Sequence, residues 1–189
     1  MHLTDIREKL AARPDLTRHL AQVKEQMATC IQCGTCSGSC PNAGFMDMTP
    51  RRMWRAVLTD RVDMVFSSQT FMLCASCYVC TLRCPRGLPL TDAMAELKQV
   101  AFALDLDRFR RSTRFYRAFM DNIRQYGRVR ETEMMARYFL AVKDPRVPMS
   151  YTGMGIKLMA KHKLHPHFPT LGPGRLGPLF ERATQQQEQ

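Results

Sequence analysis

The chain has 189 residues, of which 45% are hydrophobic and 8% aromatic, so it can bury a core and wholesale disorder is not expected. Lys and Arg number 28 against 17 Asp and Glu, and this net charge of +11 indicates an acidic partner or an anionic surface. The eight cysteines are too sparse for a small disulfide scaffold, and all of them lie between positions 30 and 84, which indicates a site.

Neither a targeting segment nor a membrane span is expected. The first residues lack the apolar stretch of a signal peptide. Residues 64–82 carry no charge, but they include several polar side chains and three cysteines, whereas a bilayer span needs about 20 strongly apolar residues. We therefore expect a soluble, cytoplasmic protein.

The first predicted helix covers residues 3–28, where Leu, Ile and Val recur at helical spacing. Pro14 is expected to divide it near Arg13, because proline removes a helical hydrogen bond and clashes with the preceding turn.

A second helix is predicted to begin at Thr49 and Pro50 and to end near Asp60, since a threonine cap followed by proline is a typical helix start. Trp54, the single tryptophan, is interpreted as a core anchor of this helix. Ser68 is expected to cap another short helix that leads toward position 74.

Three further helices are predicted at residues 90–104, 107–126 and 131–142, with Gly127 ending the second of them. No segment shows the alternation of a strand, so the sequence predicts a mainly α protein. Beside the apolar seam of the helix at 107–126 lie five arginines, the last of them just beyond its end: Arg110, Arg114, Arg117, Arg124 and Arg128. These arginines form either a solvated face or a docking face for an acidic subunit. Nucleic-acid binding is not expected, because no recognition module accompanies the charge.

Residues 143–178 hold six of the 11 prolines and five of the 10 glycines, together with a net charge of +5. We expect an extended arm that lies along another surface, followed by a disordered end over residues 184–189. His162, His165 and His167 fall in this arm, and they are interpreted as part of an interaction segment, with a metal site as the alternative.

The cysteines form two sets with the same internal spacing, C-x2-C-x2-C-x3-C-P, repeated at an offset of 44 residues. The first set is Cys30, Cys33, Cys36 and Cys40, followed by Pro41. The second set is Cys74, Cys77, Cys80 and Cys84, followed by Pro85.

This spacing is typical of two [4Fe-4S] clusters. Three closely spaced thiolates in one loop can reach three irons of a cluster, and in two-cluster ferredoxins the fourth cysteine ligates the other cluster. We therefore expect one cluster on Cys30, Cys33, Cys36 and Cys84, and a second on Cys74, Cys77, Cys80 and Cys40. Metal binding would then be part of folding.

Other interpretations of the cysteines are weaker but stay open. Structural zinc prefers paired C-x2-C knuckles, and disulfides are not expected without a secretory signal. A regulatory iron–sulfur sensor has the same ligand spacing as an electron carrier. Because eight ligands use all eight cysteines, the chain has no thiol left for catalysis, which favours an electron relay without a catalytic residue.

On these motifs, on the Thr-Pro helix between them and on the segment Asn122–Glu131, the chain resembles the C-type component of heterodisulfide reductase (HdrC-like). The resemblance implies an α-helical ferredoxin domain at residues 1–106, an arginine-rich helical extension at 107–142 and a basic, extended subunit-docking tail at 143–189. All eight cysteines carry over as ligands.

The resemblance also implies a relay of single electrons between two partners. One is an HdrA-like flavin and iron–sulfur subunit, and the other is an HdrB-like subunit with cysteine-rich CCG motifs, which this sequence lacks. The iron–sulfur subunit of another anaerobic flavin-based oxidoreductase is the alternative. With two oxidised clusters of about −2 each, the net charge falls from +11 to roughly +7.

Overall fold

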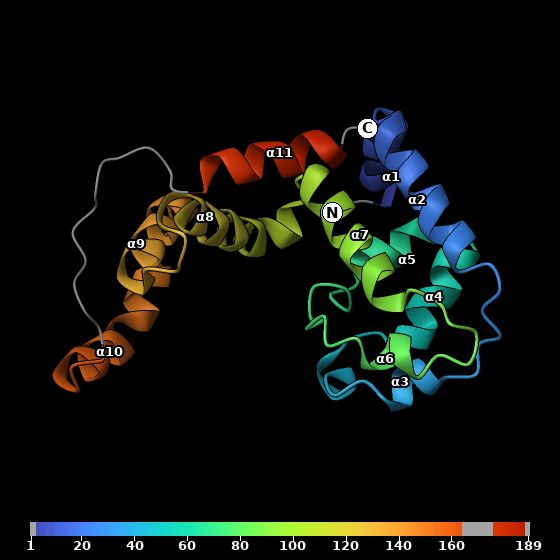
Figure 1. The fold of residues 1–189 in the computed structure, drawn as a ribbon, viewed down its shortest axis with the longest axis horizontal. Helices are drawn as coiled ribbons and strands as arrows, with labels where there is room; N and C mark the ends of the chain where they lie inside the picture. The colour runs from blue at the N-terminus through green and yellow to red at the C-terminus, as the bar shows by residue number, and fades with distance from the viewer. Residues whose placement is uncertain (1–2, 164–175, 188–189) are drawn as a thin grey trace. The chain divides into compact units, whose positions relative to one another are not determined.

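The computed structural model describes residues 3–163 and 176–187, and over these residues every regular element is a helix (Figure 1). The chain divides into two compact units, residues 1–106 and 107–189. The mainly α architecture predicted from the sequence is confirmed.

The first unit is built from short helices around two loops that carry the cysteines. Its elements are α1 (Leu3–Ala11), α2 (Pro14–Gln26), α3 (Thr35–Gly38), η1 (Ala43–Phe45), α4 (Pro50–Leu58), α5 (Val62–Ser67), α6 (Val79–Leu82) and α7 (Leu90–Ala103). Helix α7 packs on α2, and α5 packs on both α1 and α4. Their shared faces bury Val23, Met53, Phe66 and Leu97, so the apolar core holds the scaffold from which the loops extend.

Local signals place most of these boundaries correctly. Pro14 is the first residue of α2, Pro50 is the first residue of α4, and Trp54 is buried, as predicted. The helix expected after Ser68 is wrong. The Ser68 hydroxyl donates to the Asp47 carboxylate at 2.7 Å, and the backbone N–H of Gln69 donates to the same group, so this segment is held as a turn against a distant loop.

The second unit contains η2 (Asp107–Phe109), α8 (Arg110–Tyr126), α9 (Glu131–Val142), α10 (Arg146–Ala160) and α11 (Gly177–Gln187). Helices α8 and α9 form an antiparallel pair, joined where Gly127 takes the left-handed conformation with φ 73°. A small apolar core of Ala118, Tyr138, Val142 and Val147 connects α8, α9 and the start of α10.

The extended arm predicted for residues 143–178 is partly wrong, because α10 occupies Arg146–Ala160. Pro145 and Pro148 lie at its N-terminus, where the backbone N–H groups have no intrahelical partner, so proline costs no helical hydrogen bond there. Residues 184–187, expected to be disordered, belong to α11. His162 follows α10, whereas His165 and His167 lie outside the described residues.

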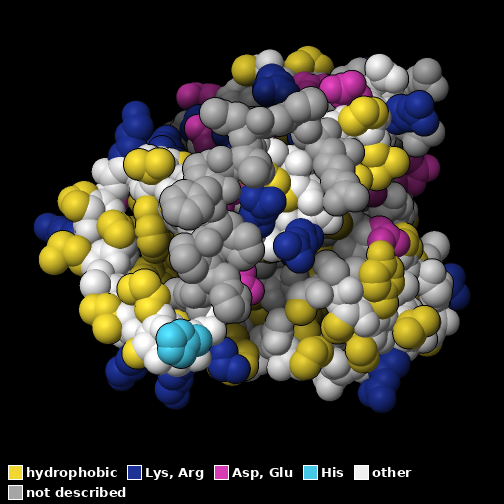
Figure 2. Space-filling view, turned by 60° about the vertical axis from the view of Figure 1, so that its left-hand side comes forward, with side chains coloured by type: hydrophobic (Ala, Val, Ile, Leu, Met, Phe, Trp, Pro, Cys, Tyr) yellow, Lys and Arg dark blue, Asp and Glu magenta, His cyan; other side chains and the backbone are white. Residues whose placement is uncertain are grey.

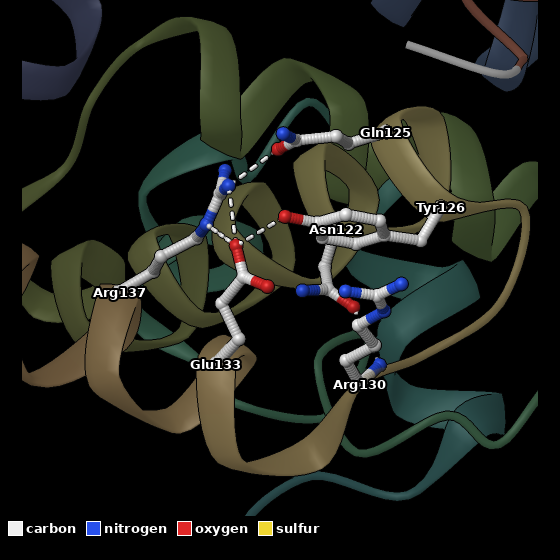
Figure 3. Close-up of polar contacts among 6 residues, drawn as sticks. All are labelled: Asn122, Gln125, Tyr126, Arg130, Glu133 and Arg137. Carbon is white, nitrogen blue, oxygen red and sulfur yellow. Dashed lines mark hydrogen bonds and ion pairs between the residues drawn. The ribbon is translucent and has the colours of Figure 1, made fainter. Parts of the chain in front are cut away.

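A partly buried polar network joins α8 and α9 (Figure 3). The Arg137 guanidinium donates to the Glu133 carboxylate, which also accepts a 2.8 Å hydrogen bond from the Tyr126 hydroxyl. Asn122 is fully buried, and its side-chain oxygen accepts the backbone N–H of Arg130 at 2.6 Å, in the loop between the helices. This bond satisfies a backbone donor at the helix–helix turn.

We expect Asn122→Ala to destabilise the second unit by about 1–3 kcal/mol, because the Arg130 N–H loses its acceptor. Hydrogen–deuterium exchange of the α8 and α9 peptides measures the loss as faster exchange in both helices. Asp121→Ala, at the neighbouring exposed position, is the matched control and should leave exchange unchanged. Equal exchange in the two variants would contradict the assigned role.

Candidate metal centre

The structure brings Cys30, Cys33, Cys36 and Cys84 together around one cavity, which we call site 1. The cavity has about 360 Å³ of space, including the part open to solvent. Three of these thiols come from the first loop and α3, and the fourth follows α6.

A second cavity, site 2, is lined by Cys40, Cys74, Cys77 and Cys80 and has about 440 Å³ of space on the same measure. Here three thiols come from the second loop and α6, and Cys40 follows α3. Each cavity therefore gathers three cysteines of one set and the last cysteine of the other.

The two loops have the same backbone conformation as well as the same spacing. Gln32 and Ser76, which are 44 residues apart, have φ values of 56° and 52°. Gly34 and Tyr78, at the same offset, have φ values of 85° and 60° and precede α3 and α6. Since left-handed conformations are costly for residues with a Cβ, three of these four positions are strained in order to wind the chain around each cavity.

The thiols differ in exposure and in acidity. Cys33 and Cys77 are exposed, and the other six are half-buried. Burial raises the pKa of the Cys36 thiol to about 11, and burial also raises the pKa of Cys40. At Cys33 the hydrogen bond with the Thr35 hydroxyl lowers the thiol pKa. Because metal ligation requires thiolates, loading of these sites must release protons.

The donor set fits an iron–sulfur cluster at each site. Four thiols surround a cavity, as a cluster with one cysteine per iron requires. Trp54 lines both cavities, is 1% exposed, and its indole N–H has no hydrogen-bond partner among the described residues. A cluster sulfur would supply the acceptor that this buried donor lacks.

No group of three or more His, Cys, Asp or Glu side chains within the described part of the chain is arranged to hold a single metal ion. His162 is therefore not part of such a group, and the other two histidines named above are not described. Likewise, no described helix combines the length and the apolar character that crossing a bilayer would need.

Several polar neighbours of the cysteines were not singled out from the sequence. The Gln32 amide donates to the Cys30 sulfur at 3.4 Å, and the Lys98 ammonium donates to the Cys74 carbonyl at 2.7 Å. Arg51 lines site 1 beside Gly34. Gln32 is a polar residue within the first cysteine motif, so the sequence alone places it near the thiols. Lys98 and Arg51 lie outside both motifs, and only the fold brings them to the cysteine loops.

Residues 29–89 match the family described as the 4Fe-4S dicluster domain. The chain is 39% identical over 87 residues to the C-type component of the ferredoxin:CoB-CoM heterodisulfide reductase of Methanosarcina mazei, covering 46% of this chain and 53% of that one. It is 34% identical over 107 residues to the C-type iron–sulfur component of the CoB–CoM heterodisulfide reductase of Methanopyrus kandleri, covering 52% and 55%.

A third relative is the C2 component of the H2/formate:CoB-CoM heterodisulfide,ferredoxin reductase of Methanococcus maripaludis, 35% identical over 75 residues and 40% of each chain. The matches span about half the length of these relatives or less. Residues 29–89 thus match a 4Fe-4S dicluster domain whose eight cysteines correspond to two [4Fe-4S] clusters, and over about half of its length the chain is similar to C-type iron–sulfur components of heterodisulfide reductases.

Proposed function

We propose that this chain is the electron-transfer subunit of a heterodisulfide-reductase-like complex and has no catalytic site of its own. The observation that carries the proposal is the division of all eight thiols between two cavities, four to each, which leaves none for disulfide chemistry. A [4Fe-4S] cluster accepts and donates one electron without proton chemistry.

The proposal assigns Cys30, Cys33, Cys36 and Cys84 as the ligands at site 1, and Cys40, Cys74, Cys77 and Cys80 as those at site 2. The lining of the two cavities supports this crossed assignment. Trp54 lines both sites and would donate its N–H to a sulfur.

Each site has an exposed edge at which an electron partner could approach. At site 1 the exposed Cys33 lies near Ile31, which is 62% exposed. At site 2 the exposed Cys77 is followed by the exposed Tyr78. Exposed apolar side chains around a redox centre suit protein contact, because apolar surface gains free energy when it is buried.

The proposed partners are a flavin and iron–sulfur A-type subunit and a CCG-motif B-type subunit. Support comes from the relatives, whose names place them as the C-type components of heterodisulfide reductases. The second unit offers a docking surface, since residues 107–189 have 16 Lys and Arg against seven Asp and Glu, which is +9 of the total +11.

Helix α10 adds apolar contact area to this basic unit. Met149, Tyr151, Met154, Ile156 and Met159 are all exposed along it, and Val147 is its buried residue. On the face drawn in Figure 2, apolar side chains are open to solvent beside Lys and Arg side chains. Apolar and basic side chains together fit an acidic protein surface with an apolar centre.

The first prediction from this function concerns iron. Anaerobic reconstitution should yield about eight irons per chain and, after reduction, EPR signals from two interacting clusters. An iron content near four, or a single uncoupled signal, would contradict the proposal.

The crossed assignment is tested by Cys84→Ala, read against Cys33→Ala and Cys77→Ala as references for loss of site 1 and site 2. We expect the EPR spectrum and iron content of Cys84→Ala to match those of Cys33→Ala, because both residues line site 1. Cys40→Ala should match Cys77→Ala for the corresponding reason. If Cys84→Ala instead resembles Cys77→Ala, the ligands are not crossed.

Docking through α10 is tested by Met154→Glu, which puts a charge into its exposed apolar surface. We expect roughly tenfold less copurification of the flavoprotein and CCG-motif subunits, identified by mass spectrometry, with unchanged iron content. Thr152→Glu adds the same charge at an exposed polar position of the same helix and should have little effect. Equal losses in both variants would show that charge alone matters and would contradict an apolar contact.

A further inference from the structure

The two cysteine sites are built as repeats, so their differences are informative. The four pairs of cysteines related by 44 residues have matching exposure, with Cys33 and Cys77 exposed and the other three pairs half-buried. The backbone conformation repeats as well. Loop geometry and the exposure class of each thiol are therefore similar at the two sites, whereas the polar side chains around the sulfurs differ.

At site 1, Gln32 and Thr35 of the first loop form hydrogen bonds to cysteine sulfurs. The Gln32 amide donates to the Cys30 sulfur at 3.4 Å, and Gln32 is held there by its left-handed backbone conformation. The Thr35 hydroxyl lies 3.3 Å from the Cys33 sulfur. A thiolate is an acceptor, so in the ligated state this hydroxyl is the donor.

The corresponding residues of site 2 are Ser76 and Val79. Ser76 has the same left-handed conformation as Gln32 but a side chain too short to reach back in the same way, and Val79 has no hydroxyl. The hydrogen bond to sulfur found here joins Cys80 and Thr91 at 3.7 Å, and the Thr91 oxygen is also 2.9 Å from the Thr81 hydroxyl.

The positively charged side chains near the two sites do not offset this difference in hydrogen bonds to sulfur. Arg51 and Arg86 line site 1, while Lys98 lies beside site 2 and directs its ammonium to the Cys74 carbonyl oxygen. Trp54 lines both cavities and so does not distinguish them.

Hydrogen bonds to the sulfurs raise the reduction potential of an iron–sulfur site, because reduction adds negative charge that the donors stabilise. We propose that site 1 has the higher reduction potential of the two, and that Gln32 and Thr35 are the positioning residues that set the difference. This inference rests on the proposed function, and it adds a direction of electron transfer. Transfer of an electron from the cluster at site 2 to the cluster at site 1 would be thermodynamically favourable.

Because the two cysteine loops are repeats, the inference can be tested by exchanging equivalent side chains between them. The double variant Gln32→Ser, Thr35→Val gives site 1 the side chains of site 2, and Ser76→Gln, Val79→Thr does the reverse. Redox titration monitored by EPR should show two midpoints in the unmodified protein. The first exchange should lower the upper midpoint and the second should raise the lower one. Each shift should change the ratio of reduced to oxidised cluster roughly tenfold, or about 59 mV for one electron.

Ser37→Thr is the matched control, since it also replaces a residue by its counterpart 44 positions on but keeps the hydroxyl. It should leave both midpoints unchanged. Equal midpoints in the unmodified protein would overturn the inference, as would a first exchange that moves the lower midpoint or moves neither.

If a variant loses one cluster, the midpoint of the remaining cluster still tests the inference. If the first exchange empties site 1, the surviving midpoint must equal the lower one of the unmodified protein, and survival of the upper one would overturn the assignment. Iron content separates this inference from the function on which it rests. About eight irons with equal midpoints refute the inference alone, whereas about four irons in the unmodified protein refute the proposed function.

Discussion

The organisation of the first unit depends on the exchange of the fourth cysteine between its two loops. One loop presents three thiols to its own cavity, and the chain then turns after α3 or α6 and delivers the next cysteine to the other cavity. Neither cavity is complete without both loops. Ligation at either site would therefore hold together segments about 44 residues apart, so the free energy of metal binding contributes to folding.

The elements that the sequence predicts well are those whose cause is local. Pro14 begins α2 and Gly127 ends α8 because the ring of proline and the absent side chain of glycine act within one turn of the helix. The failures depend on distant contacts. Ser68 is drawn to Asp47 by a hydrogen bond across 21 residues, and Val147 of α10 is buried in a core shared with α8 and α9. The sequence prediction missed α10 because it relied on the proline and glycine content of residues 143–178.

The same distinction between local and distant causes applies to the candidate metal centre. The spacing of the cysteines predicts which residues are candidates, since it is a property of short loops. The polar environment could not be predicted from spacing, because it depends on conformation. Gln32 reaches the Cys30 sulfur only through a left-handed backbone, and Trp54 reaches both cavities only through the packing of α4. Residues that tune a repeated site are best found by comparing the two copies in three dimensions.

The net charge of the whole chain conceals a contrast between its two units. Residues 1–106 have 12 Lys and Arg against 10 Asp and Glu, so two oxidised clusters of about −2 each would make this unit negative. Residues 107–189 retain their excess of +9. In the proposed function, the basic second unit would attract an acidic partner at long range, whereas electrons would be exchanged at the exposed Cys33 and Cys77 of the first unit. If the proposed function is correct, attraction and electron exchange belong to different units of the chain, so that a substitution could alter one without altering the other.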